Sequence, residues 1–145
     1  DPLACDRDQV SAHCLLLDTG VVRNGDAGAV LISQHQDRDD VRELARLARA
    51  FASELAFGDM EICGLLMDQA WSIKKKFIAR RRTNALYEAA LDAGAWGGKL
   101  CGAGGGGFLL FLAPPERHTA IAETLGLRHV PIRVGVTGSE VCYGV

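Results

Sequence analysis

Apolar residues recur at helical spacing over long parts of the chain. Between Val41 and Phe57 they return every three or four residues, so they fall on one face of a helix. Gly58 follows directly, and glycine is the residue type that most often ends a helix. The same period continues beyond it, and capping residues mark two shorter segments. The pattern predicts helices over Asp26–Gln34, Val41–Phe57, Met60–Phe77, Asn84–Ala93 and Glu116–Leu125.

Other apolar residues form continuous or alternating runs, which are typical of β-strands. The first run contains a turn at Thr19-Gly20, and the second is uninterrupted. The runs predict strands over Cys14–Val22, Phe108–Ala113, Val130–Val136 and Ser139–Tyr143. Strands and helices do not alternate strictly, which favours an α+β fold with an antiparallel sheet covered by helices on one face. We expect residues 1–145 to form a single domain.

Composition and charge exclude several classes of protein. Apolar residues make up 48% and charged residues 23% of the 145 residues, and the formal net charge is −2. This is an ordinary globular balance without the basic excess that nucleic-acid binding requires. No apolar run approaches the roughly 20 residues of a membrane span. The five cysteines and four histidines show no metal-ligand spacing, so we predict reduced thiols, a cytoplasmic location and no metal site.

Glycine is concentrated in one stretch, GGKLCGAGGGGFLLFLAPP, from Gly97 to Pro115. Such a run allows another backbone or a ligand to approach closely, and it aligns backbone N–H groups around one concave space. A flexible hairpin loop is the simpler interpretation, but turns need only one or two glycines. A Walker A loop is excluded because no Lys-Ser or Lys-Thr follows the glycines. A dinucleotide-binding fingerprint is disfavoured because an apolar strand, rather than a helix, follows.

The segment AGAWGGKLCGAGGGGFLLFLAPPE resembles the third conserved motif of the GHMP kinases. It is most similar to the sugar-phosphate branch, the D-glycero-D-manno-heptose 7-phosphate kinases. LLLDTGVVR, LLMDQAWSIKKKF, LYEAALDAGAWGGK and RHVPIRVGVTGSEVCY resemble further parts of the same family in the same order. The chain departs from the family at Asp18, where an aromatic residue is usual, and at Asn24-Gly25-Asp26, where small hydroxyl residues are usual.

The resemblance implies the C-terminal domain of such a kinase, a ferredoxin-like α+β variant. The phosphate loop and the catalytic acidic residue belong to an N-terminal, ATP-binding domain, and neither has a counterpart here. We therefore expect no catalytic residue in the chain and no turnover by the chain alone. The complete protein is expected to use ATP, Mg²⁺ and a sugar phosphate.

The same resemblance assigns candidate site residues. Gly98 would be a peripheral helper, and the other candidates fall into two sets. The loop bordering the cleft would be Gly102, Ala103, Gly104, Gly105, Gly106 and Gly107. Contacts to the substrate phosphate would be made by Arg23, Lys99 and one lysine of Lys74–Lys76, with Lys75 as the representative.

Each of these interpretations has an alternative. The basic run KKKFIARRR is consistent with a solvated helix end as well as with an anion site. Trp71 is more typical of a helix core than of a sugar-stacking residue, and Asp18 is more typical of a turn than of a hydroxyl contact. The chain as a whole could instead be a small-molecule-binding or dimerisation module without catalysis, because the fold does not determine the function. A homodimer is compatible with either interpretation.

Overall fold

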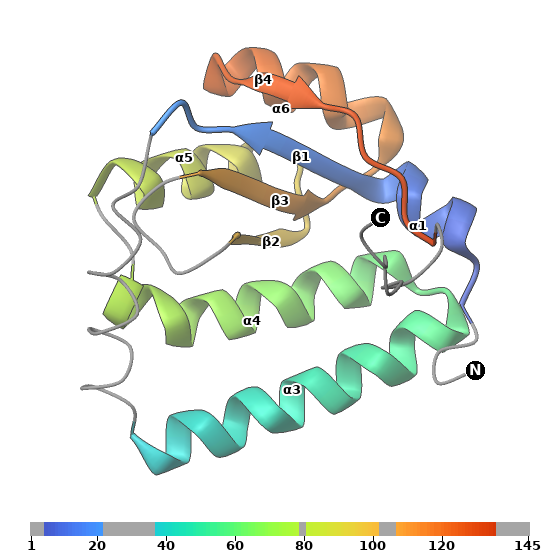
Figure 1. The fold of residues 1–145 in the computed structure, drawn as a ribbon, viewed down its shortest axis with the longest axis vertical. Coiled ribbons are helices and arrows are strands. Elements are labelled where there is room, and N and C mark those ends of the chain that lie inside the picture. The colour runs from blue at the N-terminus through green and yellow to red at the C-terminus, as the bar shows by residue number, and fades with distance from the viewer. Residues whose placement is uncertain (1–4, 22–36, 79–80, 102–106, 136–145) are drawn as a thin grey trace, which may run out of the picture.

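The computed structural model describes residues 5–21, 37–78, 81–101 and 107–135. Figure 1 shows a small sheet with two helices behind it and two long helices beneath it. The helices are α1 (Arg7–His13), α3 (Arg38–Phe57), α4 (Met60–Ile78), α5 (Arg81–Asp92) and α6 (His118–Leu125), with a 3₁₀ turn η1 (Pro115–Arg117) before α6. The strands are β1 (Cys14–Asp18), β2 (Gly97–Leu100), β3 (Phe108–Leu112) and β4 (Arg128–Val130).

The four strands form one antiparallel sheet in the order β2-β3-β1-β4. β1 lies between two strands that come much later in the chain, with Leu16 opposite Leu110 on one side and Val130 on the other. The predicted α+β class with an antiparallel sheet is confirmed. No helix within the described ranges is both long enough and apolar enough to cross a membrane.

Alternate residues of the strands pack against different helices. Leu15 and Leu17 of β1 are fully buried in a cluster that includes Tyr87 of α5 and Ile121 of α6. Cys14 lies on the opposite face of the sheet and packs in a second cluster. In that cluster, Met60 and Cys63 of α4 contact Val10 and Leu112. Helices α5 and α6 thus cover one face as expected, and the structure adds α4, backed by α3, on the other (Figure 1).

The helix ends follow the residues that were expected to set them. Gly58 ends α3 with a φ of 84°, in the left-handed region that glycine tolerates best. Asp59 then accepts a hydrogen bond of 3.0 Å from the backbone N–H of Ile62, in the first turn of α4. The predictions for both long helices are therefore confirmed to within a few residues.

Several predicted boundaries were wrong. The first strand ends at Asp18, and the strand expected over Val130–Val136 ends at Val130 instead. Pro131 comes next and has no N–H to donate to a ladder. Helix α1 was not predicted because its seven residues carry little periodicity, although Asp6 caps it through hydrogen bonds of 3.0 Å from Asp8 and Gln9. The helix expected over Asp26–Gln34 and the strand expected over Ser139–Tyr143 lie outside the described residues.

The first two glycines of the glycine-rich stretch belong to a strand rather than to a loop. A Cβ atom on Gly97 would collide with the backbone of α4, at the carbonyl oxygen of Gly64 and the amide nitrogen of Asp68. A Cβ atom on Gly98 would collide with Leu110 and with the ring of Phe111 in β3. These glycines let α4 cross the edge strand in backbone contact, so the expected helper role of Gly98 is replaced by a packing role.

His118 is expected to make the protein less stable as the solution is acidified. Its Nε2 lies 3.2 Å from the carbonyl oxygen of Ala113. Burial lowers the pKa of His118 below its ordinary value of 6.5, and the hydrogen bond to Ala113 opposes this only in part. Because the unfolded chain then binds more protons below about pH 6.5, the free energy of unfolding should fall there and level off below the folded pKa.

Thermal unfolding of the parent and of His118→Gln at pH 7.5 and pH 5.5 tests this expectation. The parent should lose more stability between the two pH values than the variant, which cannot titrate at this position. Equal losses in the two proteins would show that His118 is not the group responsible.

Candidate functional site

The candidate site residues predicted from the sequence cluster at one end of the sheet, here called the loop end. We define it by Asp18–Val21 after β1, Lys99–Cys101 at the end of β2, and Gly107-Phe108 at the start of β3. The last turns of α4 and the first turn of α5 lie at the same end (Figure 1). The fold therefore gathers at one place segments that are far apart in the chain.

A tight backbone junction holds the two sides of the loop end together. The N–H of Thr19 donates to the carbonyl of Gly107 at 2.9 Å, and the N–H of Gly107 donates to the carbonyl of Val21 at 2.9 Å. The buried hydroxyl of Thr19 donates to the same Gly107 oxygen at 2.7 Å. Gly107 has a φ of 98°, which a residue with a side chain rarely adopts. The junction fixes the end of the glycine-rich loop against β1.

The other end of that loop is fixed by β-pairing. The N–H of Cys101 donates to the carbonyl of Phe108 at 2.8 Å, which closes a hairpin between β2 and β3. The glycine stretch is therefore the connection of a hairpin, as the simpler sequence interpretation had it, and its ends are held on both sides. Gly102, Ala103, Gly104, Gly105 and Gly106 lie outside the described residues, as does Arg23.

Asp18 acts as a turn former at the loop end. Its carboxylate accepts from the N–H of Gly20 at 2.9 Å and from the guanidinium of Arg128 at 2.8 Å. The hydrogen bond from Arg128, and then that from Gly20, holds the pKa of Asp18 below its ordinary value. The carboxylate is thus already occupied by two donors, and the turn interpretation of Asp18 is confirmed.

The three consecutive lysines of α4 point to different partners. Lys75 lies 3.6 Å from Glu88 of α5, and Lys76 lies 3.8 Å from Asp40 of α3. Burial and the neighbouring charge of Lys99 lower the pKa of Lys74, so Lys74 is the lysine of this run that faces the loop end. The sequence analysis chose Lys75 as the representative, and only the positions of α3 and α5 separate the three.

A buried polar group missed by the sequence analysis seals the open edge of β2. The hydroxyl of Tyr87 donates to the carboxylate of Asp68 at 2.9 Å and accepts from the N–H of Gly98 at 3.0 Å. Trp71 stacks on Tyr87 with ring centroids 5.0 Å apart and is 1% exposed. Trp71 is therefore a core residue, and the sugar-stacking alternative does not apply to it.

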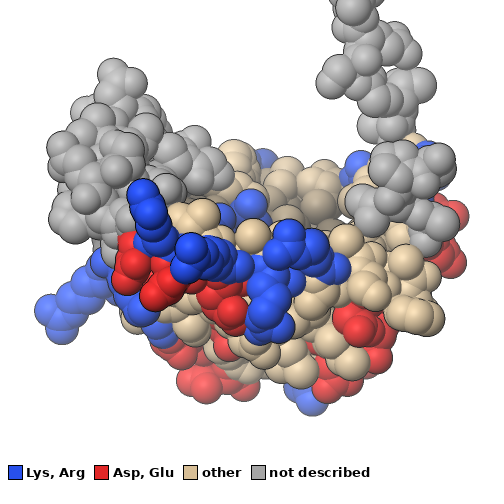
Figure 2. Space-filling model, turned by 90° about the horizontal axis from the view of Figure 1, so that it is seen from below, with Lys and Arg blue, Asp and Glu red and all other residues tan. Residues whose placement is uncertain are grey.

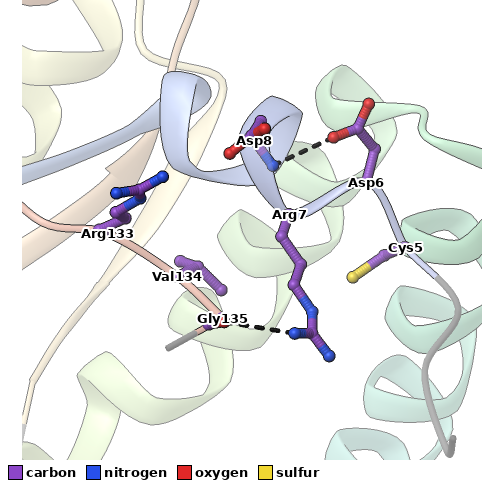
Figure 3. A pocket seen from close by; sticks show the side chains of 7 residues that line it. All are labelled: Cys5, Asp6, Arg7, Asp8, Arg133, Val134 and Gly135. Atoms are coloured by element: carbon purple, nitrogen blue, oxygen red, sulfur yellow. Dashed lines mark hydrogen bonds between the residues drawn. The ribbon is translucent and has the colours of Figure 1, made fainter. Parts of the chain in front are cut away.

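Two hollows lie away from these residues. One, of about 440 Å³, is lined by residues at the opposite end of β1 (Figure 3): Cys5, Asp6, Arg7, Asp8, Arg133, Val134 and Gly135. In it, Arg7 donates to the carbonyl of Gly135 at 3.2 Å. The other is a groove of about 380 Å³ between α3 and α4, which reaches Lys74 at one end. Within the described part of the chain, no three metal-binding side chains converge on a common point.

The surface charges of α3 are mixed in sign. Figure 2 shows Lys and Arg beside Asp and Glu over the face that carries this helix. Arg46 makes two hydrogen bonds to Glu43, at 2.6 and 2.9 Å, and Arg42 bonds Asp39 at 3.1 Å. Such interleaved pairs are typical of a solvated helix face rather than of a surface for nucleic acid.

Comparisons with known proteins agree with the fold. The family model described as GHMP kinases C terminal matches residues 34–129. No curated protein matches the chain. Among solved structures, phosphomevalonate kinase from Streptococcus pneumoniae matches with a TM-score of 0.69 and 18% identity, covering 81% of this chain and 38% of that one.

Two further solved structures are similar to the same degree. Mevalonate kinase from L. major has a TM-score of 0.66 and 21% identity over 78% of this chain and 37% of its own. A D-glycero-D-manno-heptose 1-phosphate kinase from Bacteriodes thetaiotaomicron has a TM-score of 0.60 and 20% identity over 92% of this chain and 37% of its own. The chain thus spans less than two fifths of each of these three kinases. The match over residues 34–129 and the shared fold show that the chain belongs to the GHMP kinases and carries their C-terminal domain.

Proposed function

We propose that the chain is the C-terminal half of an ATP-dependent kinase, forms one wall of its substrate cleft and is inactive by itself. The single observation that carries this proposal is the junction of Thr19 and Gly107. It anchors the glycine-rich loop at the loop end, beside Lys99, where a ligand could approach the backbone closely. We treat residues 1–145 as one domain in this proposal.

The acceptor we propose is a sugar phosphate of the heptose type. The glycine motif, in which Gly-Gly-Lys precedes Gly-Ala-Gly-Gly-Gly-Gly-Phe, supports this choice. The similar solved structures are named as mevalonate, phosphomevalonate and heptose 1-phosphate kinases, so the fold is compatible with several acceptors. A cytoplasmic setting belongs to the proposal as well, since the four described cysteines are free thiols.

The contributions of the two halves differ in kind. Phosphoryl transfer depends on positioning and on stabilising charge around the transferred group. In our proposal this chain supplies the loop Gly102–Gly107 as a wall, with Lys99, Arg23 and a lysine of α4 as cationic helpers. The N-terminal half would supply the phosphate loop and the catalytic carboxylate. We assign no magnesium ligand to this chain, because its described residues include no cluster that fits the ion.

Mapping of ligand binding onto the backbone amides tests this proposal. At millimolar Mg-ATP or glucose 6-phosphate, the amide signals of Thr19, Gly20, Lys99 and Gly107 should shift. The signals of Arg7 and Asp8, at the hollow near the N-terminal end of β1, serve as the internal control. Shifts confined to that hollow would contradict the cleft-wall role and favour a binding module of another kind.

A further inference from the structure

Lys74 is the exception in a run of three lysines. Lys75 and Lys76 each have a carboxylate within 4 Å, from Glu88 and Asp40 respectively. Over the described ranges, Lys74 makes no ion pair with a carboxylate. A cation that is partly desolvated without a counter-ion is costly, so this position calls for an explanation.

Lys99 reaches the same place from the sheet. Gly97 faces α4, because a Cβ atom there would meet Gly64 and Asp68. Residues two apart in a strand point to the same side, so Lys99 also faces the side on which α4 lies. The contacts advance together along both elements: Gly64 approaches Trp96 and Gly97, and Asp68 reaches Gly98 through the Tyr87 hydroxyl. The turn of α4 after Asp68 is thus carried toward Lys99.

The electrostatics agree with this placement. Burial lowers the pKa of Lys74, and the positive charge of Lys99 lowers it further. Lys99 is exposed and, like Lys74, has no carboxylate partner among the described side chains. The two acidic residues closest along the strands and helix are engaged elsewhere, Asp18 by Arg128 and Asp68 by Tyr87.

The surface beside the two lysines is open and largely apolar. Leu110 lies opposite Lys99 in the sheet and is only partly buried, and Phe108 is 38% exposed. On the other side of Lys74 lies the apolar groove between α3 and α4. Two unpaired cations on an apolar, accessible floor are suited to a small anion, which would be desolvated there and would neutralise both.

We propose that Lys74 and Lys99 together bind a terminal phosphate group of a ligand in the cleft. The place of this site rests on the pattern of ion pairs and on the register of α4 against β2. The choice of phosphate over other anions rests on the proposed function. The phosphate can come from the acceptor or from the nucleotide, and the experiment below distinguishes the two.

The pairing of the two lysines is tested without any ligand. In a protein labelled at the lysine side-chain carbons, Lys99→Gln should raise the pKa of Lys74 measured by NMR. The matched control is Lys76→Gln, which removes the same charge from the same helix but belongs to the ion pair with Asp40. A Lys74 pKa that responds to both variants equally would overturn the placement.

Ligand binding is tested by titration of the chain with glucose 6-phosphate, with ATP and with glucose. For the ester that occupies the site, Lys74→Gln and Lys99→Gln should each weaken binding about tenfold, whereas Lys76→Gln should change it less than twofold. Glucose should show no dependence on either lysine. A loss seen with glucose 6-phosphate places the acceptor phosphate at the site, and a loss seen only with ATP places the nucleotide there.

Unchanged binding of both esters in both variants would overturn the site. That result leaves the proposed function standing, because phosphoryl transfer by the complete protein is measured separately. Conversely, a complete protein without kinase activity whose phosphate binding still depends on Lys74 and Lys99 would overturn the proposed function alone.

Discussion

Replacing Gly97 with alanine is expected to destabilise the protein by about 3 kcal/mol or more. The added Cβ atom would lie 2.8 Å from the carbonyl carbon of Gly64 and 2.9 Å from the amide nitrogen of Asp68. Both are backbone atoms within α4, which cannot yield by rotating a side chain. Either β2 must leave the sheet edge or α4 must move off the sheet, and both changes disrupt the core. Urea unfolding followed by circular dichroism measures the loss.

Lys99→Ala is the matched control for this substitution. It lies on the same strand and points to the same side, but its side chain is exposed, so the expected change is below about 0.5 kcal/mol. Gly64→Ala should be destabilising as well, because its Cβ atom would lie 2.5 Å from that of Trp96. A Gly97→Ala protein as stable as Lys99→Ala would contradict the close backbone contact between β2 and α4.

Tyr87→Phe is expected to cost about 1–3 kcal/mol, since it leaves a buried donor without a partner. The hydroxyl accepts from the N–H of Gly98 and donates to Asp68, and Tyr87 itself is 1% exposed. Burial raises the pKa of Tyr87, which keeps the hydroxyl protonated and able to donate. Loss of the hydroxyl also exposes the edge of β2 to incorrect pairing. The free energy of unfolding in urea is the quantity to compare.

Asp68→Asn provides the contrast to Tyr87→Phe. The amide oxygen of asparagine can still accept from Tyr87, and the bond to Gly98 is untouched, so the cost should be smaller than that of Tyr87→Phe. An Asp68→Asn protein that is less stable than Tyr87→Phe would show that the carboxylate charge, rather than the satisfied edge of β2, governs this cluster.

The long helices could be predicted because their signals are local. The periodicity of α3 and α4 and the Gly58-Asp59 boundary lie in a few neighbouring residues. Strand β2 could not be predicted in this way, because its glycines are explained by Gly64 and Leu110, which are far away in the sequence. Only the assembled fold separates the packing glycines, Gly97 and Gly98, from the loop glycines that follow them.

The candidate site divides in the same manner. Thr19 and Gly107 are 88 residues apart, and no spacing rule connects them, so only the resemblance to a family indicated that their segments belong together. The choice between Lys74 and Lys75 depends on where α3 and α5 place Asp40 and Glu88. Ion pairs between elements are set by tertiary packing, which a basic run alone does not reveal.

Kinase turnover tests the central claim most directly. ADP formation is followed by a coupled assay for the isolated chain and for the full reading frame that encodes it, each with Mg-ATP. The acceptors to be tried are heptose 7-phosphate, mevalonate, phosphomevalonate and homoserine. We predict no acceptor-dependent turnover by the isolated chain and clear turnover by the full protein, most strongly with the sugar phosphate. Turnover by the chain alone, or none by the full protein with any acceptor, would contradict the assignment of this chain as one half of a kinase.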